Sequence, residues 1–235
     1  MGEKNLSNIF LIGFSYSGKS QVGRAVAERL GWDFTDTDDE IVAQAKKPIP
    51  EIFAEDGEEY FRELERQALV NVCPGKEMVV ATGGGIILAA ENRELMKKSG
   101  VVVCLEAAPE TIYSRLLIDD KKGESKVVRP LLFGPDPERR IARLKEFRQP
   151  YYAVADWTVH TDCLTLEEVA AEVIRGWNYI RRQESRVEGR GTADSPVAMT
   201  ATESYPPIPN ETEPKRQFGK FQCPNPKFQI ISKSQ

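Results

Sequence analysis

The chain carries a phosphate-binding sequence near its start. Residues 13–20 read GFSYSGKS, which matches the pattern GxxxxGKS/T; they follow an apolar run at 8–12 and lead into helical sequence from Gln21. Glycines at this spacing let successive backbone N–H groups surround phosphate oxygens at a helix N-terminus. Lys19 would then reach the β and γ phosphates, and the Ser20 hydroxyl would bind Mg²⁺. The nucleotide contacts that this motif predicts come from Gly13, Ser15, Tyr16, Ser17, Gly18, Lys19, Ser20 and Gln21.

Two carboxylates, Asp36 and Asp38, follow the segment 32–35. If the strand continues through them, its periodicity points both side chains the same way, so that one serves the metal and the other an acceptor hydroxyl. Acidic residues at a strand-to-helix junction also cap helices, and that alternative stays open at this point. The phosphate loop itself does not identify the acceptor, because GTPases, ATPases, nucleotide kinases and metabolite kinases all use it.

Four more motifs follow in order along the chain. They are GEEYFRELE at 57–65, ATGGG at 81–85, RPLL at 129–132 and RQPYY at 148–152. Together with the phosphate loop and the DTD sequence, they give the chain a close resemblance to the shikimate kinase family over about residues 8–180. The resemblance implies that ATP, with Mg²⁺, phosphorylates the 3-hydroxyl of shikimate. The products would be ADP and shikimate 3-phosphate, in a cytoplasmic step of chorismate and aromatic amino acid biosynthesis.

The resemblance also implies roles for the residues that match the family's motifs. Mg²⁺ would be held by Ser20 and Asp36. Shikimate would be bound by Asp38, Arg62, Gly83, Gly84, Gly85 and Arg148, with the two arginines on its carboxylate. Glu65, three residues after Arg62, is placed to orient that arginine on one helix face.

Catalysis, on the same resemblance, would depend on Lys19, Asp38 and Arg129. Asp38 would accept the hydroxyl proton or orient the hydroxyl. Arg129 would lie on a mobile lid that closes over the ATP phosphates and offsets charge on the transferring group. Arg115 falls where the family has an arginine against the adenine, and it completes the nucleotide-binding set with Arg129.

Two local features are predicted from residue type. Family members usually carry glycine where this chain has Tyr16, and a bulky residue is expected to have ordinary negative φ there. This departure bears on nucleotide affinity. Pro150 is expected to end the helix that carries Arg148, because a proline restricts the residue before it.

The elements that must position these residues form an alternating pattern over residues 1–180. Short apolar runs alternate with helical periodicity, which predicts an α/β protein with βα units around a parallel sheet of five strands. The resemblance implies the three-layer α/β/α P-loop kinase fold. The expected strands are 8–13, 33–36, 78–82, 101–105 and 156–160. The expected helices are 19–31, 39–46, 57–73, 91–99, 109–118, 136–149 and 165–182. The polar, turn-rich segment 119–135 is predicted to be a mobile flap.

Composition excludes several other classes of protein. A formal net charge of −4 argues against a dedicated nucleic-acid binder, and no apolar stretch approaches the roughly 20 residues of a membrane span. The single histidine, His160, argues against a Ser/His/Asp triad. The four cysteines are widely spaced without a CxxC motif, which argues against zinc or a redox pair and for a reducing cytoplasm. A monomer is the expected oligomeric state.

The C-terminal part differs in composition from the rest. Residues 181–235 contain nine Lys/Arg, six Asp/Glu, 7 of the 15 prolines and no leucine. We therefore predict a kinase-like domain at 1–182 and a disordered tail at 183–235. The tail is interpreted as an inert extension or as a partner-binding segment with a sticky end, formed by Phe218, Phe221, Phe228, Ile230 and Ile231.

Two other functions stay open on the sequence alone. One is another small-molecule P-loop kinase, of the gluconate or nucleoside monophosphate type, which shares the loop and the lid. The other is a non-catalytic, nucleotide-binding relative that acts through its tail. The paired arginines and the ATGGG motif favour shikimate over other acceptors.

Overall fold

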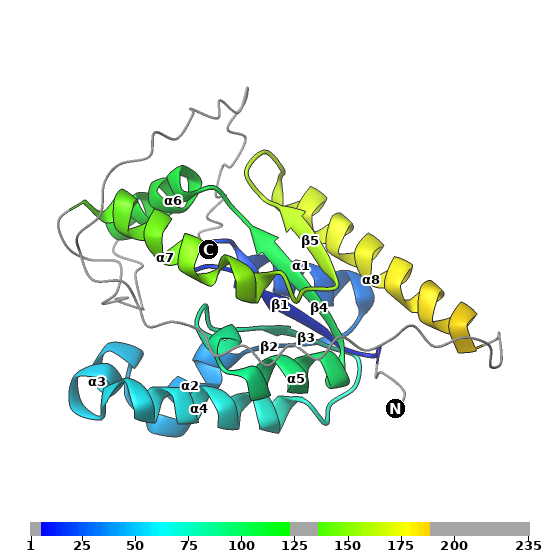
Figure 1. The fold of residues 1–235 in the computed structure, drawn as a ribbon, viewed down its shortest axis with the longest axis horizontal. Helices are drawn as coiled ribbons and strands as arrows, with labels where there is room; N and C mark the ends of the chain where they lie inside the picture. The colour runs from blue at the N-terminus through cyan, green and yellow to red at the C-terminus, as the bar shows by residue number, and fades with distance from the viewer. Residues whose placement is uncertain (1–5, 123–135, 189–235) are drawn as a thin grey trace, which may run out of the picture.

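The computed structural model describes residues 6–122 and 136–188. A five-stranded parallel sheet lies at its centre, with strand order β2-β3-β1-β4-β5 (Figure 1). The strands are β1 (Ile9–Ile12), β2 (Asp33–Asp36), β3 (Met78–Ala81), β4 (Val101–Glu106) and β5 (Trp157–His160). Central strand β1 pairs with β3 and β4, so that Ile9 lies opposite both Val79 and Val101.

Strands β1, β3 and β4 form where the sequence has continuous apolar runs, whereas the edge strands β2 (DFTD) and β5 (WTVH) also contain polar residues. All four residues of β1, IFLI, are buried, as are the first five of β4, VVVCL. A parallel sheet covered on both faces needs apolar side chains pointing both ways, which is why these runs do not alternate with polar residues. The expected strands and the three-layer architecture are confirmed.

Helices cover both faces of the sheet. Helices α1 (Lys19–Leu30) and α8 (Leu166–Glu188) pack on the face formed by Ile9, Leu11 and Val103. Helices α4 (Gly57–Val72), α5 (Ala90–Ser99), α6 (Pro109–Lys122) and α7 (Pro137–Tyr152) cover the opposite face, where Phe10 and Val102 lie. A short 3₁₀ helix, η1 (Ile86–Leu88), follows the glycine turn after β3.

A smaller helical group lies beside the β2 edge of the sheet. It consists of α2 (Thr37–Ala45), α3 (Ile49–Glu55) and α4, and its own apolar core includes Ile41, Ile52 and Phe61 (Figure 1). Helix α3 is absent from the sequence expectation, because prolines 48 and 50 make its start look like a turn. Pro50 lies in the first helical turn, where the missing N–H costs nothing.

Several helix ends differ from the expectation. Helix α7 continues through Pro150 to Tyr152, so the prediction that this proline ends the helix is wrong. Only its last turn contains the proline, so a single hydrogen bond is lost, and Tyr152 is anchored from outside the helix. Helix α8 runs to Glu188, past the expected end at 182, and the division into a domain and a tail stays a prediction. Helix α6 extends into the expected flap, of which residues 123–135 lie outside the described part.

The functional motifs meet at one edge of the sheet. The phosphate loop and the glycines at 83–85 follow the carboxyl ends of β1 and β3, and Asp36 is the last residue of β2, the other neighbour of β3 in the sheet. Ligands of open parallel sheets bind at this edge, at the point where two neighbouring strands connect to helices on opposite faces of the sheet. No helix within residues 6–122 or 136–188 has the length and apolar character needed to cross a membrane.

Candidate active site

The phosphate loop has a backbone that few side chains tolerate. Gly13 has φ 144° and Gly18 has φ 96°. A Cβ on Gly13 would lie 2.4 Å from the carbonyl oxygen of Leu105, at the end of β4. Glycine is therefore required at position 13 both by backbone conformation and by the close approach of the neighbouring strand.

Tyr16 adopts a left-handed conformation with φ 62°. The expectation of an ordinary φ at this bulky residue is wrong. The conformation is held from outside the loop, because Arg115 Nη1 donates a hydrogen bond of 3.0 Å to the Tyr16 carbonyl. The half-buried tyrosine ring also packs against the core of the α4–α7 face.

Arg115 bridges the phosphate loop and the end of β5. Besides Tyr16, it donates to the Thr161 hydroxyl at 3.2 Å and to the Thr161 carbonyl at 2.9 Å. Burial lowers the pKa of this guanidinium, with Asp162 acting in the opposite direction. Arg115 thus lies against the nucleotide loop.

Lys19 is the first residue of α1 and is 8% exposed. Its ammonium group donates to the carbonyl oxygens of Gly13, at 3.0 Å, and Phe14, at 2.9 Å. The ammonium group therefore lies against the loop backbone that would surround phosphate.

Asp36 connects the loop to the next helix through both of its carboxylate oxygens. Oδ2 accepts a 2.5 Å hydrogen bond from Ser20, and Oδ1 accepts a 3.0 Å hydrogen bond from the backbone N–H of Asp38. Helix capping and metal binding were alternatives on the sequence, but the structure shows that Asp36 caps α2 while it also faces Ser20.

Asp38 reaches the site by a different route from the one expected. Strand β2 ends at Asp36, and α2 begins at Thr37, so Asp38 is a helical residue and strand alternation does not place it. A Cβ on Gly83 would lie 2.7 Å from Asp38 Oδ1, which places this carboxylate against the glycine turn. Thr37, missed in the sequence analysis, accepts a 2.9 Å hydrogen bond from Gly83 N and fixes the start of that turn.

Arg62 faces the glycine turn from helix α4. Its Nη1 donates to Glu65 at 2.5 Å and its Nη2 to Glu58 at 2.8 Å. A Cβ on Gly85 would lie 2.3 Å from Nη1, so the guanidinium lies directly on the turn. Glu58 was not predicted as a site residue, although its i, i+4 spacing from Arg62 is a recognisable signal.

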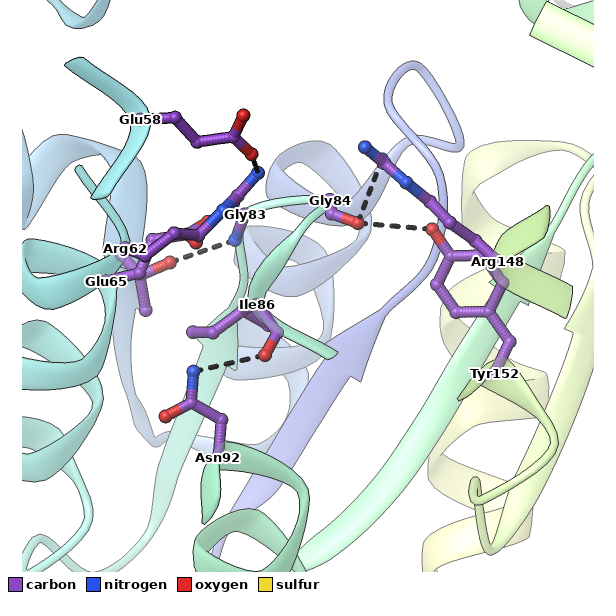
Figure 2. A network of polar contacts seen from close by, with 10 residues as sticks. Glu58, Arg62, Glu65, Gly83, Gly84, Ile86, Asn92, Arg148 and Tyr152 are labelled. Atoms are coloured by element: carbon purple, nitrogen blue, oxygen red, sulfur yellow. Dashed lines mark hydrogen bonds and ion pairs between the residues drawn. The ribbon is translucent and has the colours of Figure 1, made fainter. Parts of the chain in front are cut away.

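Arg148 reaches the same turn from helix α7. Its Nη1 donates to the Gly84 carbonyl at 3.2 Å, and the Tyr152 hydroxyl donates to the same oxygen, also at 3.2 Å. Figure 2 shows Arg62 and Arg148 on opposite sides of the Gly83–Gly84 segment. Burial raises the pKa of Tyr152, which keeps its phenol protonated and able to donate.

Glu65 is the most deeply buried ionisable group in this cluster, with 1% of its surface exposed. Burial raises its pKa to about 7. Arg62 opposes the shift by attraction and by a hydrogen bond, whereas the negative charge of Asp38 adds to it. The group therefore changes charge near neutral pH in contact with Arg62.

The glycine turn also touches the phosphate loop. A Cβ on Gly84 would meet Ser15 Oγ at 3.2 Å, and the Arg148 guanidinium lies 5.4 Å from the centre of the Phe14 ring. A small molecule held between the arginines would thus lie beside the loop that cradles phosphate. Glu106 and Lys145 form a further ion pair at the end of β4, which the sequence analysis did not single out.

Two further residues were predicted for this site. Gln21 is exposed in the first turn of α1. Arg129 lies outside the described residues, as does most of the expected lid.

A phosphate loop next to a glycine turn flanked by two arginines, at the carboxyl edge of this sheet, defines the molecule as a P-loop small-molecule kinase. Comparison with known proteins specifies the family. The family model described as shikimate kinase matches residues 16–178. The chain belongs to the shikimate kinase family and is a phosphotransferase with shikimate kinase activity.

Individual relatives agree with this assignment. The chain is 44% identical to the shikimate kinase of Symbiobacterium thermophilum over 168 residues, which cover 71% of this chain and 94% of that protein. It is 42% identical to the enzyme of Thermodesulfovibrio yellowstonii over 170 residues, covering 72% and 94%. The solved structure of shikimate kinase from Acinetobacter baumannii in complex with shikimate gives a TM-score of 0.68 at 36% identity, covering 77% of this chain and 96% of that one.

Proposed function

We propose that this chain transfers the γ-phosphoryl group of ATP to the 3-hydroxyl of shikimate, with the phosphate loop binding ATP and Arg62 and Arg148 binding the shikimate carboxylate. One observation carries the placement of the acceptor: both arginines lie against one glycine turn, since Arg148 donates to the Gly84 carbonyl and a Cβ on Gly85 would lie 2.3 Å from Arg62 Nη1. Two guanidinium groups converging on one turn suit a planar carboxylate, which arginine binds through paired hydrogen bonds.

The glycine turn sets the depth of the acceptor site. Side chains at positions 83–85 would occupy the space next to Asp38, Ser15 and Arg62. With glycine there, a ring that carries hydroxyls can approach the backbone closely. Asp38 lies at this position and would accept a hydrogen bond from the reacting hydroxyl. In a loose phosphoryl-transfer transition state the nucleophile needs positioning more than early deprotonation, so this contact suffices to align the attack.

The donor set of Ser20 and Asp36 fits Mg²⁺. One hydroxyl and one carboxylate oxygen lie 2.5 Å apart at the start of α1, and Mg²⁺ prefers a few hard oxygen ligands, completed by phosphate oxygens and water. When bound, the ion would neutralise charge on the β and γ phosphates. The protein's own part is to hold these two oxygens in place through the cap between Asp36 and Asp38.

Lys19 and Arg129 supply the remaining positive charge in this proposal. Lys19 would exchange its contacts with the loop carbonyls for contacts with phosphate oxygens. Arg129 is assigned from the family motif alone, and its role is to cover the phosphates and exclude water, since an open site would hydrolyse ATP.

The test is ADP release from ATP·Mg²⁺ by the purified full chain, with shikimate, gluconate or a nucleoside monophosphate as acceptor. We expect release with shikimate and not with the other two, and a fall in kcat by orders of magnitude in Lys19→Met. The product should carry phosphate on the 3-hydroxyl. Equal release with gluconate, or full activity in Lys19→Met, contradicts the proposal.

A further inference from the structure

A groove on the β5 side of the molecule is separate from the site described above. It has a volume of ≈ 660 Å³ and lies between β5 and the first turns of α8. Strand β5 pairs only with β4 in the described sheet, so its other side is an edge (Figure 1). Edge strands expose backbone donors and acceptors that a further segment of chain can use.

The side chains of this groove combine an apolar surface with negative charge. Val159, Leu164 and Ala171 supply apolar contacts, whereas Asp162, Glu168 and Glu172 supply three carboxylates, of which Glu172 also pairs with Arg175 on the same helix. Such a groove suits an extended segment with alternating apolar and basic residues, because each kind of side chain finds a partner there.

Cys163 lies in the same groove and is disulfide-bonded. Cys73 and Cys104, the other two cysteines of the described residues, are buried free thiols. The expectation that the widely spaced cysteines contain no redox pair is therefore wrong. The chain has four cysteines, so Cys223 is the one that remains for a bond within the chain.

The sequence around Cys223 has the complementary chemistry. Residues 214–235 contain no acidic residue and carry the charges of Lys215, Arg216, Lys220, Lys227 and Lys233. Aromatic residues Phe218, Phe221 and Phe228 alternate with these charges. The basic side chains of this segment are complementary to the three carboxylates of the groove, and its aromatic side chains are complementary to the groove's apolar surface.

The length of the intervening chain also fits. Helix α8 starts beside the groove at Leu166 and ends at Glu188, so its end lies roughly 33 Å from its start at 1.5 Å per residue. Residues 188 and 223 are 35 residues apart in sequence, and a random coil of that length has a root-mean-square end-to-end distance of about 32 Å. The effective concentration of a tethered segment is highest when these two lengths agree.

We propose that residues 214–235 dock in this groove of their own chain, with basic side chains opposite Asp162, Glu168 and Glu172, and that a disulfide between Cys223 and Cys163 fastens them there. Forming this bond joins the two Sγ atoms and releases two protons and two electrons, which reduce one low-molecular-weight disulfide to two thiols. In reducing surroundings the docking is non-covalent, so the bond makes the attachment responsive to redox conditions.

The experiment equilibrates the full chain with mixtures of a low-molecular-weight thiol and its disulfide, traps free thiols by alkylation, and maps the peptides by mass spectrometry. We expect a Cys163–Cys223 peptide pair in the monomeric protein. The equilibrium constant gives the effective concentration of the two thiols. Glu172→Lys should lower this effective concentration about two- to fivefold, which is the range for the loss of an exposed ion pair. Glu167→Lys, on the same helix but outside the groove, should leave the effective concentration unchanged.

A second set of variants avoids any effect on the domain. Lys220→Glu with Lys227→Glu changes only the segment and should lower the same constant, and combining this pair with Glu172→Lys should restore part of the loss. A disulfide between two chains, pairing of Cys163 with another cysteine, or equal constants for Glu172→Lys and Glu167→Lys would overturn the proposal.

Discussion

Arg148 and Tyr152 donate hydrogen bonds to one and the same oxygen, the carbonyl of Gly84, each at 3.2 Å. The two donors lie on consecutive turns of α7, on either side of Pro150. The final turn of this helix is thus held by the glycine turn it helps to shape, which explains why the proline does not end it. The contact also fixes one of the two arginines before any acceptor arrives.

The two arginines can be tested by their effect on shikimate alone. Arg62→Ala or Arg148→Ala should raise the KM for shikimate about 10- to 100-fold with little change in the KM for ATP, because a hydrogen bond to a charged group is worth about 1.5–3 kcal/mol. Arg66→Ala is the matched control, since this arginine lies on α4 and pairs with Glu63 at the surface. Steady-state kinetics measures both constants. An unchanged KM for shikimate in both variants would remove the arginines from the site.

The double contact of Asp36 allows its two roles to be separated. Asn at position 36 can still cap α2, so Asp36→Asn should change the free energy of unfolding by less than about 1 kcal/mol. The half-saturating Mg²⁺ concentration should rise roughly tenfold or more, because a charged contact worth about 1.5–3 kcal/mol is lost. Asp39→Asn, with the same exchange at an exposed position, is the control. Equal Mg²⁺ dependence in the two variants would contradict the metal role.

The backbone of Tyr16 predicts an unusual order of stability. Tyr16→Ala and Tyr16→Gly remove the same ring, but alanine keeps the cost of a left-handed φ. We therefore expect Tyr16→Gly to be more stable than Tyr16→Ala by about 1 kcal/mol. The control is Ala25→Gly in helix α1, which should lower the free energy of unfolding of the native chain by about 1 kcal/mol. Urea denaturation measures all four proteins, and a more stable Tyr16→Ala would show that φ at this position is not strained.

The pKa of Glu65 predicts a pH dependence of stability. Folding raises this pKa from 4.5 to about 7, so the folded protein holds the proton more tightly than the unfolded chain does. The contribution of Glu65 to the free energy of unfolding is fully present below pH 4.5 and is lost as pH rises through 7. The total loss is on the order of 3 kcal/mol. Glu65→Gln does not titrate, so its stability relative to the native chain should rise across this window. Denaturation curves between pH 4.5 and 8 test this, and parallel pH profiles would show that Glu65 does not titrate in this window.

The fold was largely predictable because its signals are local. Continuous apolar runs predicted β1, β3 and β4, and the glycine-rich loop predicted the start of α1. Helix α3 was missed since its prolines resemble a turn until their position in the first turn is known. The path of α7 through Pro150 depends on a bond to Gly84, 68 residues from Tyr152 in sequence. A contact of that kind leaves no trace in local periodicity.

The geometry of the site was predictable only in part. Motif positions indicated which residues gather at the carboxyl edge, but not how they touch. Asp38 lies near the turn because a capped helix begins at Thr37, whereas strand periodicity gave the wrong reason for the same proximity. The left-handed φ of Tyr16 depends on Arg115, which approaches from α6. Tertiary contacts override the local preference in both cases.

The central position of β1 has a consequence for how the chain folds. Ile9 pairs with Val79 and Val101, which follow it by 70 and 92 residues. During synthesis at about 5–20 residues per second, this first strand would wait roughly 5–20 s for its second neighbour. Its IFLI sequence is apolar and open to wrong pairing during that interval. The phosphate loop, which needs the Leu105 carbonyl beside Gly13, would take shape only after β4 has been made, although it leaves the ribosome about 90 residues earlier.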